Sequence, residues 1–301
     1  MDSSHNGSFA ADQEQATDPF FYKHSPQRIL ILAPHPDDET LAAGGMIATA
    51  LTLGVRSQIR VIVATNGDAS YSTVLLHGYH LATQKSFQQQ AVLRQQESLR
   101  ALALLGLDAG QIHFWGFPDR GLATLWKNRQ KNEHLFRSST TGFSESIQAL
   151  NSSVLPFTGD NLVTLIKQEL SDFLPTMIIM PHPQDQHSDH SALAGFTLHA
   201  MQQIDIQQQE VMPALYAYWM WQKNKPWLTG MRPQDIGQVA AGKAAALKVR
   251  RLALSPEVRE KKRRALLCYP SQRIAAGKLF REAAHATHET FIAWSPILQH
   301  V

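Results

Sequence analysis

Two short segments of the sequence concentrate histidines and carboxylates. They are His35-Pro-Asp-Asp-Glu39 and His182-Pro-Gln-Asp-Gln-His-Ser-Asp-His190. Imidazole and carboxylate groups suit a catalytic zinc, which takes three protein ligands and leaves a fourth position for water. Helix capping and turn formation also favour such residues and could account for either segment alone. Two segments of this density are much harder to explain in that way, so together they indicate one metal site.

The spacing inside each segment fits a shared site. His35 and Asp38 are three residues apart, so a tight turn into a helix can direct both side chains at one point. His187 and His190 have the same separation. The second segment can therefore supply the third ligand and leave one histidine for chemistry.

Each segment directly follows a short apolar run that predicts a strand buried on both faces of a parallel sheet. These runs are Arg28–Pro34 and Met177–Met180. Ligands of open α/β sheets bind beyond the carboxyl ends of the strands. Both segments therefore fall where one site would be built.

Alternating strand and helix signals predict an α/β fold of Rossmann-like type, with a mostly parallel, doubly wound sheet flanked by helices. Further strands are expected at residues 59–65, 112–115 and 215–219, and helices at 41–53, 82–107, 161–173, from 191 onward and at 256–291. No G-x-G-x-x-G fingerprint is present, which disfavours a dinucleotide-binding protein.

The polar residues 1–27 predict a flexible N-terminal tail, followed by a single domain at 28–301. Apolar periodicity fails at 120–158 and 222–236, which predicts two long loops. A segment as long as the first is usually an active-site loop or a disordered insert. Its polar side chains and Trp126 could contact a substrate.

Composition excludes several other classes of protein. The net charge of +3 is small for 301 residues and gives no indication of a nucleic-acid partner. The single cysteine, Cys268, excludes a disulfide within the chain and a cysteine-based zinc site. No apolar run approaches the roughly 18 residues of a membrane span, and the N-terminal region lacks the apolar core of a secretory signal. We therefore expect a cytoplasmic protein with no membrane partner.

At these residues the sequence resembles the LmbE-like, or PIG-L, family of zinc-dependent N-acetylglucosaminyl de-N-acetylases. The signatures His-Pro-Asp-Asp-Glu and His-x-Asp-His stand here as His35–Glu39 and His187–His190, with Ser188 where proline is common. Weaker matches extend from residue 28 to 291 and include Asn66-Gly-Asp68, Arg94-Gln-Gln-Glu97, Gly116-Phe-Pro-Asp119, Lys262, Tyr269 and Glu289-Thr-Phe291.

The resemblance implies one bound Zn²⁺ per chain, or another divalent metal such as Fe²⁺. Its ligands would be His35, Asp38 and His190. By the same resemblance, Asp37 corresponds to the general base that accepts a proton from the attacking water.

The resemblance also assigns the remaining candidate site residues. His187 corresponds to the histidine that stabilises the oxyanion, and Asp189 to a residue that orients a histidine. Arg94 and Asp119 fall where some relatives contact the substrate.

The implied activity is removal of the N-acetyl group from an N-acetylglucosamine-type sugar or glycoconjugate, and a homo-oligomer is compatible with it. Two alternatives stay open. One is a zinc amidohydrolase acting on a non-sugar acylated metabolite, which would have the same fold and ligands. The other is a catalytically inactive metal-binding module, against which the retention of Asp37 counts.

Overall fold

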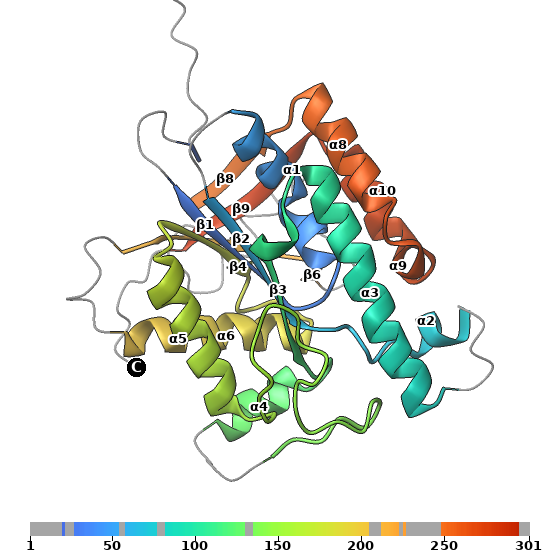
Figure 1. Cartoon of the computed structure of the whole chain (residues 1–301). Helices are drawn as coiled ribbons and strands as arrows, with labels where there is room; N and C mark the ends of the chain where they lie inside the picture. Colours follow the sequence, from blue (N-terminus) through green and yellow to red (C-terminus); the bar gives the residue numbers. More distant parts are fainter. Residues whose placement is uncertain are drawn as a thin grey trace, which may run out of the picture.

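A seven-stranded sheet with the strand order β3-β2-β1-β4-β5-β9-β8 forms the centre of the protein (Figure 1). In this computed structural model the described residues are 20–21, 27–53, 58–76, 82–129, 135–204, 212–222, 225–226 and 248–294.

The sheet is parallel from β3 to β5 and antiparallel at its last two strands. Its strands are β1 (Arg28–Ala33), β2 (Gln58–Thr65), β3 (Ile112–Phe117), β4 (Met177–Pro181), β5 (Ala214–Tyr218), β8 (Lys248–Ala253) and β9 (His288–Trp294). A separate short hairpin joins β6 (Trp221–Gln222) to β7 (Lys225–Pro226). The predicted α/β class with a mostly parallel sheet is confirmed.

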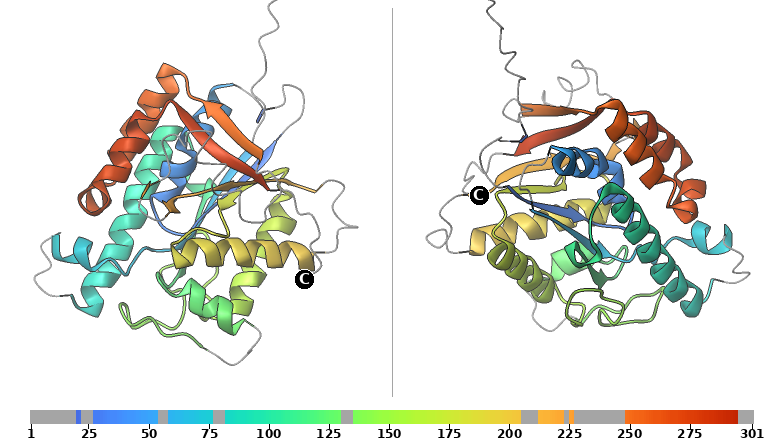
Figure 2. Two further views of the ribbon diagram at one scale, coloured as in Figure 1. Left: turned by 180° about the vertical axis from the view of Figure 1, so that it is seen from behind. Right: turned by 45° about the horizontal axis from the view of Figure 1, so that its top comes forward.

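Helices cover both faces of the sheet (Figure 2). One layer contains α1 (Asp38–Thr52), α3 (Gln84–Leu105), α8 (Pro256–Leu266) and α10 (Gly277–His285), and the other contains α4 (Leu122–Asn128), α5 (Gly159–Phe173) and α6 (Ser188–Gln203). The shorter α2 (Tyr71–Leu76), a 3-10 turn at Ala109–Gln111 and α9 (Pro270–Ala275) connect these elements.

Strand β1 shows why this layering follows from the sequence. Successive side chains of a strand point to opposite faces. Ile29 and Ile31 enter the core under α1 and α3, while Leu30 and Leu32 enter the core under α5 and α6. An uninterrupted apolar run is therefore what a strand with helices on both sides requires.

The prediction that residues 256–291 are helical throughout is wrong at its end. The helices stop at His285, and β9 begins at His288 and inserts between β5 and β8. Strand β8 was not among the expected strands. Both pairings join residues far apart in the chain, so tertiary contacts override the local helical signal.

The predicted N-terminal tail also needs correction. Phe20 and Phe21 are 1% and 3% exposed, and the Gln27 side chain donates a hydrogen bond to the Phe20 carbonyl at 3.0 Å. The Phe20 ring contacts Tyr216 and Phe291 at centroid distances of 5.1 and 5.5 Å. Ordered packing therefore begins before residue 28, while residues 1–19 and 22–26 lie outside the described residues.

The expected irregular segment 120–158 contains α4 and an ordered loop. Leu150 pairs with Phe114 as an isolated bridge beside the edge strand β3, and Ser138 and Ser146 are buried. Trp126 packs on Phe196 of α6 at a centroid distance of 5.0 Å. The described part of this segment is thus a packed layer. Most of the other expected loop, 222–236, lies outside the described residues.

No helix in the described part of the chain has the length and apolar character needed to cross a membrane.

The burial of the N-terminal aromatic pair can be tested by stability. Phe20→Ala should lower the free energy of unfolding by about 3–5 kcal/mol, because it removes a large buried ring. Val154→Ala, at a side chain that is 53% exposed, is the control and should change it by less than about 0.5 kcal/mol. Urea denaturation measures both. Equal stability of Phe20→Ala and the control would show that this segment does not pack on the core.

Candidate metal centre

The two histidine- and carboxylate-rich segments meet at one edge of the sheet. Strands β1 and β4 are parallel neighbours, with Ile31 opposite Ile179, so the chain leaves both strands at the same end. The first segment turns at Pro36 into α1, and the second turns into α6. This juxtaposition, predicted from the sequence, is confirmed by the strand order.

One oxygen of Asp38 lies between histidines of the two segments. Asp38 Oδ2 is 3.0 Å from His35 Nδ1 and 3.2 Å from His190 Nε2. Ligand atoms about 2.0–2.1 Å from a tetrahedral metal lie about 3.3 Å from one another. The separations of Asp38 Oδ2 from these two ring nitrogens are therefore those expected of ligands to a common cation.

A second ring of carboxylates faces the outer nitrogens of the two histidines. Asp185 Oδ2 is 3.5 Å from His190 Nδ1. Asp119 Oδ1 and Asp189 Oδ2 are 3.2 and 3.4 Å from His35 Nε2. Metal-binding histidines typically place their other ring nitrogen against a carboxylate, and both histidines here have that arrangement.

His190 provides an independent observation in favour of a cation. Its side chain is 0% exposed, yet neither ring nitrogen makes a hydrogen bond of acceptable geometry among the described residues. Its Nε2 is within ion-pair distance of Asp38 but is not directed at it as a hydrogen-bond donor would be. Buried polar nitrogens without a hydrogen-bond partner are rare, and a metal ion shared with Asp38 would give His190 Nε2 a partner.

Other combinations of donors also lie close together. Ligand atoms of His35, His187 and His190 fall within 4.8 Å of one another, and so do those of His35, Asp119 and Asp189. The arrangement therefore forms a potential metal site with more than three candidate donors.

The charges of these groups are strongly coupled. Burial lowers the pKa of His190, but Asp38 and Asp185 outweigh it and raise that pKa to about 9. Burial likewise opposes the ionisation of Asp38, whose pKa is nevertheless held well below its usual range by His190 and His35. Binding of a cation by these histidines must displace protons.

Asp37 has an unusual backbone conformation at the start of α1. Its φ of 130° lies in a region that side-chain-bearing residues rarely adopt, and such outliers gather at functional sites. Its N–H donates to Glu39 Oε2 at 2.9 Å, and its carboxylate lies 3.4 Å from Arg94 Nη2. Burial raises the pKa of Asp37 to about 8, with Arg94 opposing the shift. A carboxyl group with this pKa is mostly protonated at neutral pH, and a nearby cation favours its ionised form.

His187 is held in one orientation at the start of α6. Its Nδ1 accepts a hydrogen bond from the Asp189 N–H at 3.3 Å, so it caps the helix. Burial, then the neighbouring His35 and His190, lower the pKa of His187 to about 4. A neutral ring that accepts at Nδ1 carries its proton on Nε2. His187 therefore presents a single N–H donor.

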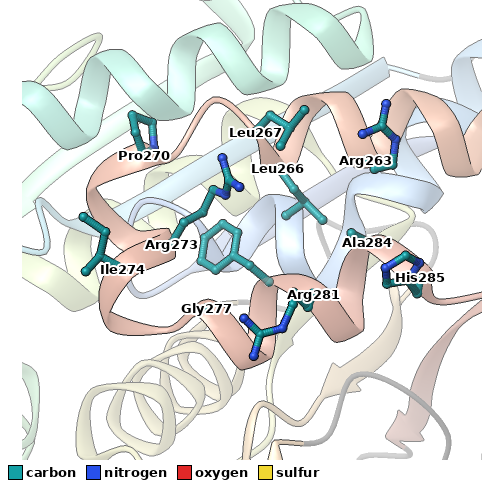
Figure 3. Close-up of a pocket in the computed structure, with 11 residues that line it drawn as sticks. Arg263, Leu266, Leu267, Pro270, Arg273, Ile274, Gly277, Arg281, Ala284 and His285 are labelled. Carbon is teal, nitrogen blue, oxygen red and sulfur yellow. The ribbon is translucent and has the colours of Figure 1, made fainter.

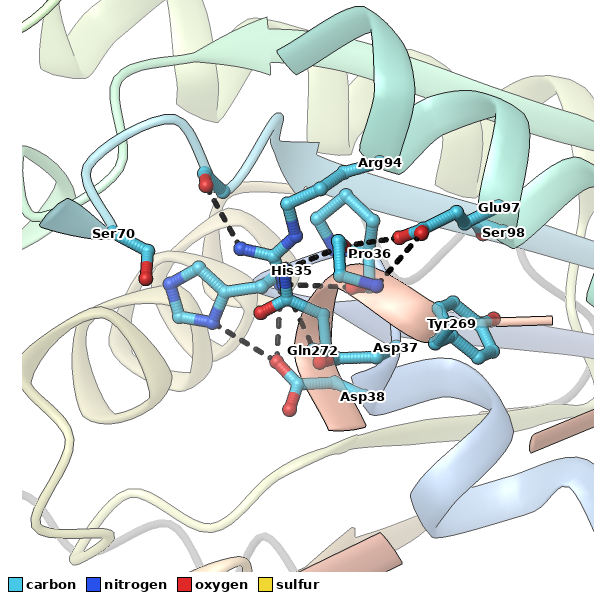
Figure 4. A network of polar contacts seen from close by, with 12 residues as sticks. His35, Pro36, Asp37, Asp38, Ser70, Arg94, Glu97, Ser98, Tyr269 and Gln272 are labelled. Carbon is cyan, nitrogen blue, oxygen red and sulfur yellow. Dashed lines mark hydrogen bonds and ion pairs between the residues drawn. The ribbon is translucent and has the colours of Figure 1, made fainter. Parts of the chain in front are cut away.

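Arg94, expected to contact a substrate, is 4% exposed and binds the protein backbone. Its guanidinium donates to the Pro36 carbonyl at 2.7 Å and the Gly67 carbonyl at 2.8 Å (Figure 4). Gly67 has a φ of 61°, and a Cβ there would lie 1.9 Å from Arg94 Nη1. This glycine therefore leaves room for Arg94 to link the loops after β1 and β2.

Asp119, the other expected substrate contact, is also occupied by the protein. Its Oδ2 accepts the Ala69 N–H at 2.9 Å, and its own N–H donates to Asp68 Oδ1 at 3.1 Å. Asp189 accepts the N–H groups of Arg120 and Leu122 at 2.6 and 3.2 Å. These carboxylates fix the loops after β2 and β3 around the histidines.

A cavity of about 590 Å³ between α8, α9 and α10 lies away from these residues (Figure 3). Its lining includes Leu266, Phe280, Arg273 and Arg281 and none of the predicted site residues.

The fold and this histidine–carboxylate cluster define an α/β protein with a potential metal centre. The sequence profile of the GlcNAc-PI de-N-acetylase (PIG-L) family matches residues 30–201, more than half of the chain. The chain therefore belongs to the PIG-L, or LmbE-like, family, as its motifs predicted. No curated protein matches it in sequence.

Solved structures with the same fold include enzymes of two kinds. Teicoplanin deacetylase, in a zinc-inhibited form, is 18% identical over 88% of this chain and 97% of its own, with a TM-score of 0.53. N,N'-diacetylchitobiose deacetylase from Pyrococcus horikoshii is 15% identical over 88% and 82%, with a TM-score of 0.52. The 4-carboxy-2-hydroxymuconate hydratase of Pseudomonas putida KT2440 is 13% identical over 85% and 82%, with a TM-score of 0.53. At these identities the likeness concerns the fold.

Arg94 can be tested as a positioning or a substrate-binding residue by kinetics. Arg94→Gln should lower kcat about 10- to 100-fold and leave KM within about twofold, because the backbone contacts of Arg94 orient the turn beside Asp37. Arg60→Gln, which removes the ion pair with Glu169, is the control and should keep both constants. A rise in KM at constant kcat would instead assign Arg94 to the substrate.

Proposed function

We propose that this protein is a metal-dependent hydrolase that removes the acetyl group from an N-acetylated sugar or glycoconjugate. The observation that supports it most is the Asp38 carboxylate between His35 and His190, with the strained Asp37 adjacent to it. The proposed ligands are His35, Asp38 and His190, each of them buried.

The donor set fits a catalytic zinc ion, and Fe²⁺ is a second candidate. Two imidazoles and one carboxylate match the three protein ligands of hydrolytic zinc sites. When bound, such a metal lowers the pKa of a water to about 7 and polarises an amide carbonyl.

In this proposal Asp37 accepts the proton of the attacking water. It is not one of the three proposed ligands, and its N–H is fixed by Glu39. Burial raises the pKa of Asp37. A bound cation would favour the ionised carboxylate and so lower this pKa toward the range in which a base is effective near neutral pH.

His187 would stabilise the developing oxyanion. A protonated imidazole could also perform this task, but the lowered pKa of His187 favours the neutral ring with a proton on Nε2. A neutral N–H donor aimed at the oxyanion is typically worth about 10²–10³ in rate. Asp189 contributes by its contact with His35 and by fixing the loop after β3.

The proposed substrate class rests on the GlcNAc-PI de-N-acetylase (PIG-L) family and on the two neighbours named teicoplanin deacetylase and N,N'-diacetylchitobiose deacetylase. The hydratase neighbour shows that the same fold also supports a different reaction. A non-sugar acylated metabolite is therefore the alternative substrate.

Metal content tests the proposed ligands. His35→Ala, Asp38→Ala and His190→Ala should each reduce bound zinc from about one ion per chain to nearly none, since each removes one of three ligands. Zinc affinity of the wild type should rise with pH up to about 9, because the raised pKa of His190 makes protons compete below that pH. Elemental analysis after dialysis measures occupancy.

His199→Ala on the same helix as His190 is the control and should retain the metal. Full zinc occupancy in any one of the three ligand variants would remove that residue from the ligand set.

Released acetate tests the reaction and the base. The zinc-loaded protein should release acetate from N-acetylglucosamine derivatives faster than from N-acetylated amino acids. Asp37→Asn should bind zinc normally and lose at least about 10²-fold in kcat, because an amide cannot accept the proton. Wild-type turnover by zinc-loaded Asp37→Asn would exclude Asp37 as the base. Acetate release from the amino acids alone would support the non-sugar alternative.

A further inference from the structure

The C-terminal segment reaches the turn that carries Asp37. Tyr269, the residue before α9, is 0% exposed although its side chain ends in a hydroxyl. That hydroxyl donates to Glu39 Oε1 at 2.7 Å, across 230 positions of the sequence. Figure 4 shows Tyr269 together with the turn from His35 to Asp38. A residue beyond the 30–201 match to the family profile thus contacts the motif at its centre.

Glu39 transmits this contact to Asp37. Its Oε1 accepts hydrogen bonds from Tyr269 and from Ser98 Oγ, the latter at 2.5 Å, and its Oε2 accepts the Asp37 N–H at 2.9 Å. Glu39 is 0% exposed, so water does not compete for these positions. Two donors on one oxygen fix the plane of the carboxylate and therefore the position of the other oxygen.

The hydrogen-bond directions around Tyr269 are determined by this arrangement. Tyr269 and Thr40 hydroxyl oxygens are 2.8 Å apart. Because the single proton of Tyr269 goes to Glu39, Thr40 must donate to Tyr269. The chain runs from Thr40 through Tyr269 to Glu39, which receives the Asp37 N–H. Both ends of this chain lie at the start of α1, and each of the two hydroxyls has a hydrogen-bond partner.

Asp37 needs such support because of its backbone. A φ of 130° is sparsely populated for a residue with a side chain and persists only where the surroundings over-determine it. Arg94 binds the Pro36 carbonyl and approaches the Asp37 carboxylate, but the Asp37 N–H has Glu39 as its partner. The orientation of this N–H therefore depends on where Glu39 is held.

The same C-terminal segment also holds α1 further along. Lys262 Nζ donates to the Leu41 carbonyl at 2.8 Å and to Glu289 at 2.6 Å. Glu289 accepts the N–H groups of Gly45 and Met46 at 2.6 and 2.7 Å. In a regular α-helix the Gly45 N–H donates to the Leu41 carbonyl, one turn earlier. Lys262 and Glu289 contact these same two groups, so the buried pair binds both ends of one turn of α1.

We propose that Tyr269 is a positioning residue that acts through Glu39 to hold Asp37 in its active orientation. Tyr269 does not touch the reacting atoms in this account. The inference rests on the proposed function, in which Asp37 is the base. Through Tyr269, the helical segment after residue 255 would support the reaction, although it lies outside the two histidine- and carboxylate-rich segments.

The test compares Tyr269→Phe with the wild type in two measurements. Zinc-loaded Tyr269→Phe should lose about 10-fold in kcat, the usual size of an outer contact at a metal site, with KM and zinc content unchanged. In the metal-free protein, amide hydrogen exchange of Asp37, followed by NMR, should become faster, because Glu39 is held less firmly. Ser98→Ala removes the second donor to the same oxygen and should show both effects, and the double variant should lose less than the product of the two single losses.

Thr197→Val is the matched control. It also removes one buried hydroxyl, whose hydrogen bond runs to the Leu193 carbonyl in α6, and should leave kcat and Asp37 exchange unchanged. Unchanged exchange and kcat in both Tyr269→Phe and Ser98→Ala would overturn the proposal, as would equal losses in Thr197→Val. Faster Asp37 exchange in a protein that releases no acetate even as wild type would contradict the proposed function and leave the contact between Tyr269 and Asp37 established.

Discussion

The arrangement of the candidate metal centre depends on one carboxylate oxygen, Asp38 Oδ2. It lies within 3.2 Å of a ring nitrogen from each of two histidines that are 155 positions apart in the chain. This approach is available because β1 and β4 are adjacent and parallel, so their carboxyl ends coincide. The order of the strands, which local sequence does not specify, therefore determines whether the two motifs form one site.

The imidazoles of His35 and His190 are surrounded by carboxylates that shift the pKa values of these histidines. Asp38, Asp185 and Asp189 are buried, and the side chain of Asp119 is 8% exposed. Burial disfavours the ionised forms of Asp38 and Asp119. Although burial lowers the pKa of His35, Asp119, Asp189 and Asp38 raise it well above its usual value. A divalent cation would place two positive charges at one point among these carboxylates.

The sequence predicted those parts of the site that lie within single segments. The apolar runs before each motif, the turn from His35 to Asp38 and the helix after His190 all have local signals, and the structure contains the expected strands and helices. The roles that depend on distant partners could not be predicted in this way. The resemblance assigned Asp119 and Arg94 to substrate contact, and no local signal predicts their contacts with the Ala69 N–H and the Gly67 carbonyl. Strand β9 and the buried Phe20 were missed for the same reason, since each is stabilised by residues more than 70 positions away.

His35, Asp38 and His190 are proposed to share a single metal ion. Crystals grown with zinc and measured on both sides of the zinc absorption edge would test it most directly. We expect one strong anomalous peak per chain, within about 2.0–2.2 Å of His35 Nδ1, an Asp38 oxygen and His190 Nε2. A peak between His35 Nε2, Asp119 and Asp189, or no peak near Asp38, would contradict it.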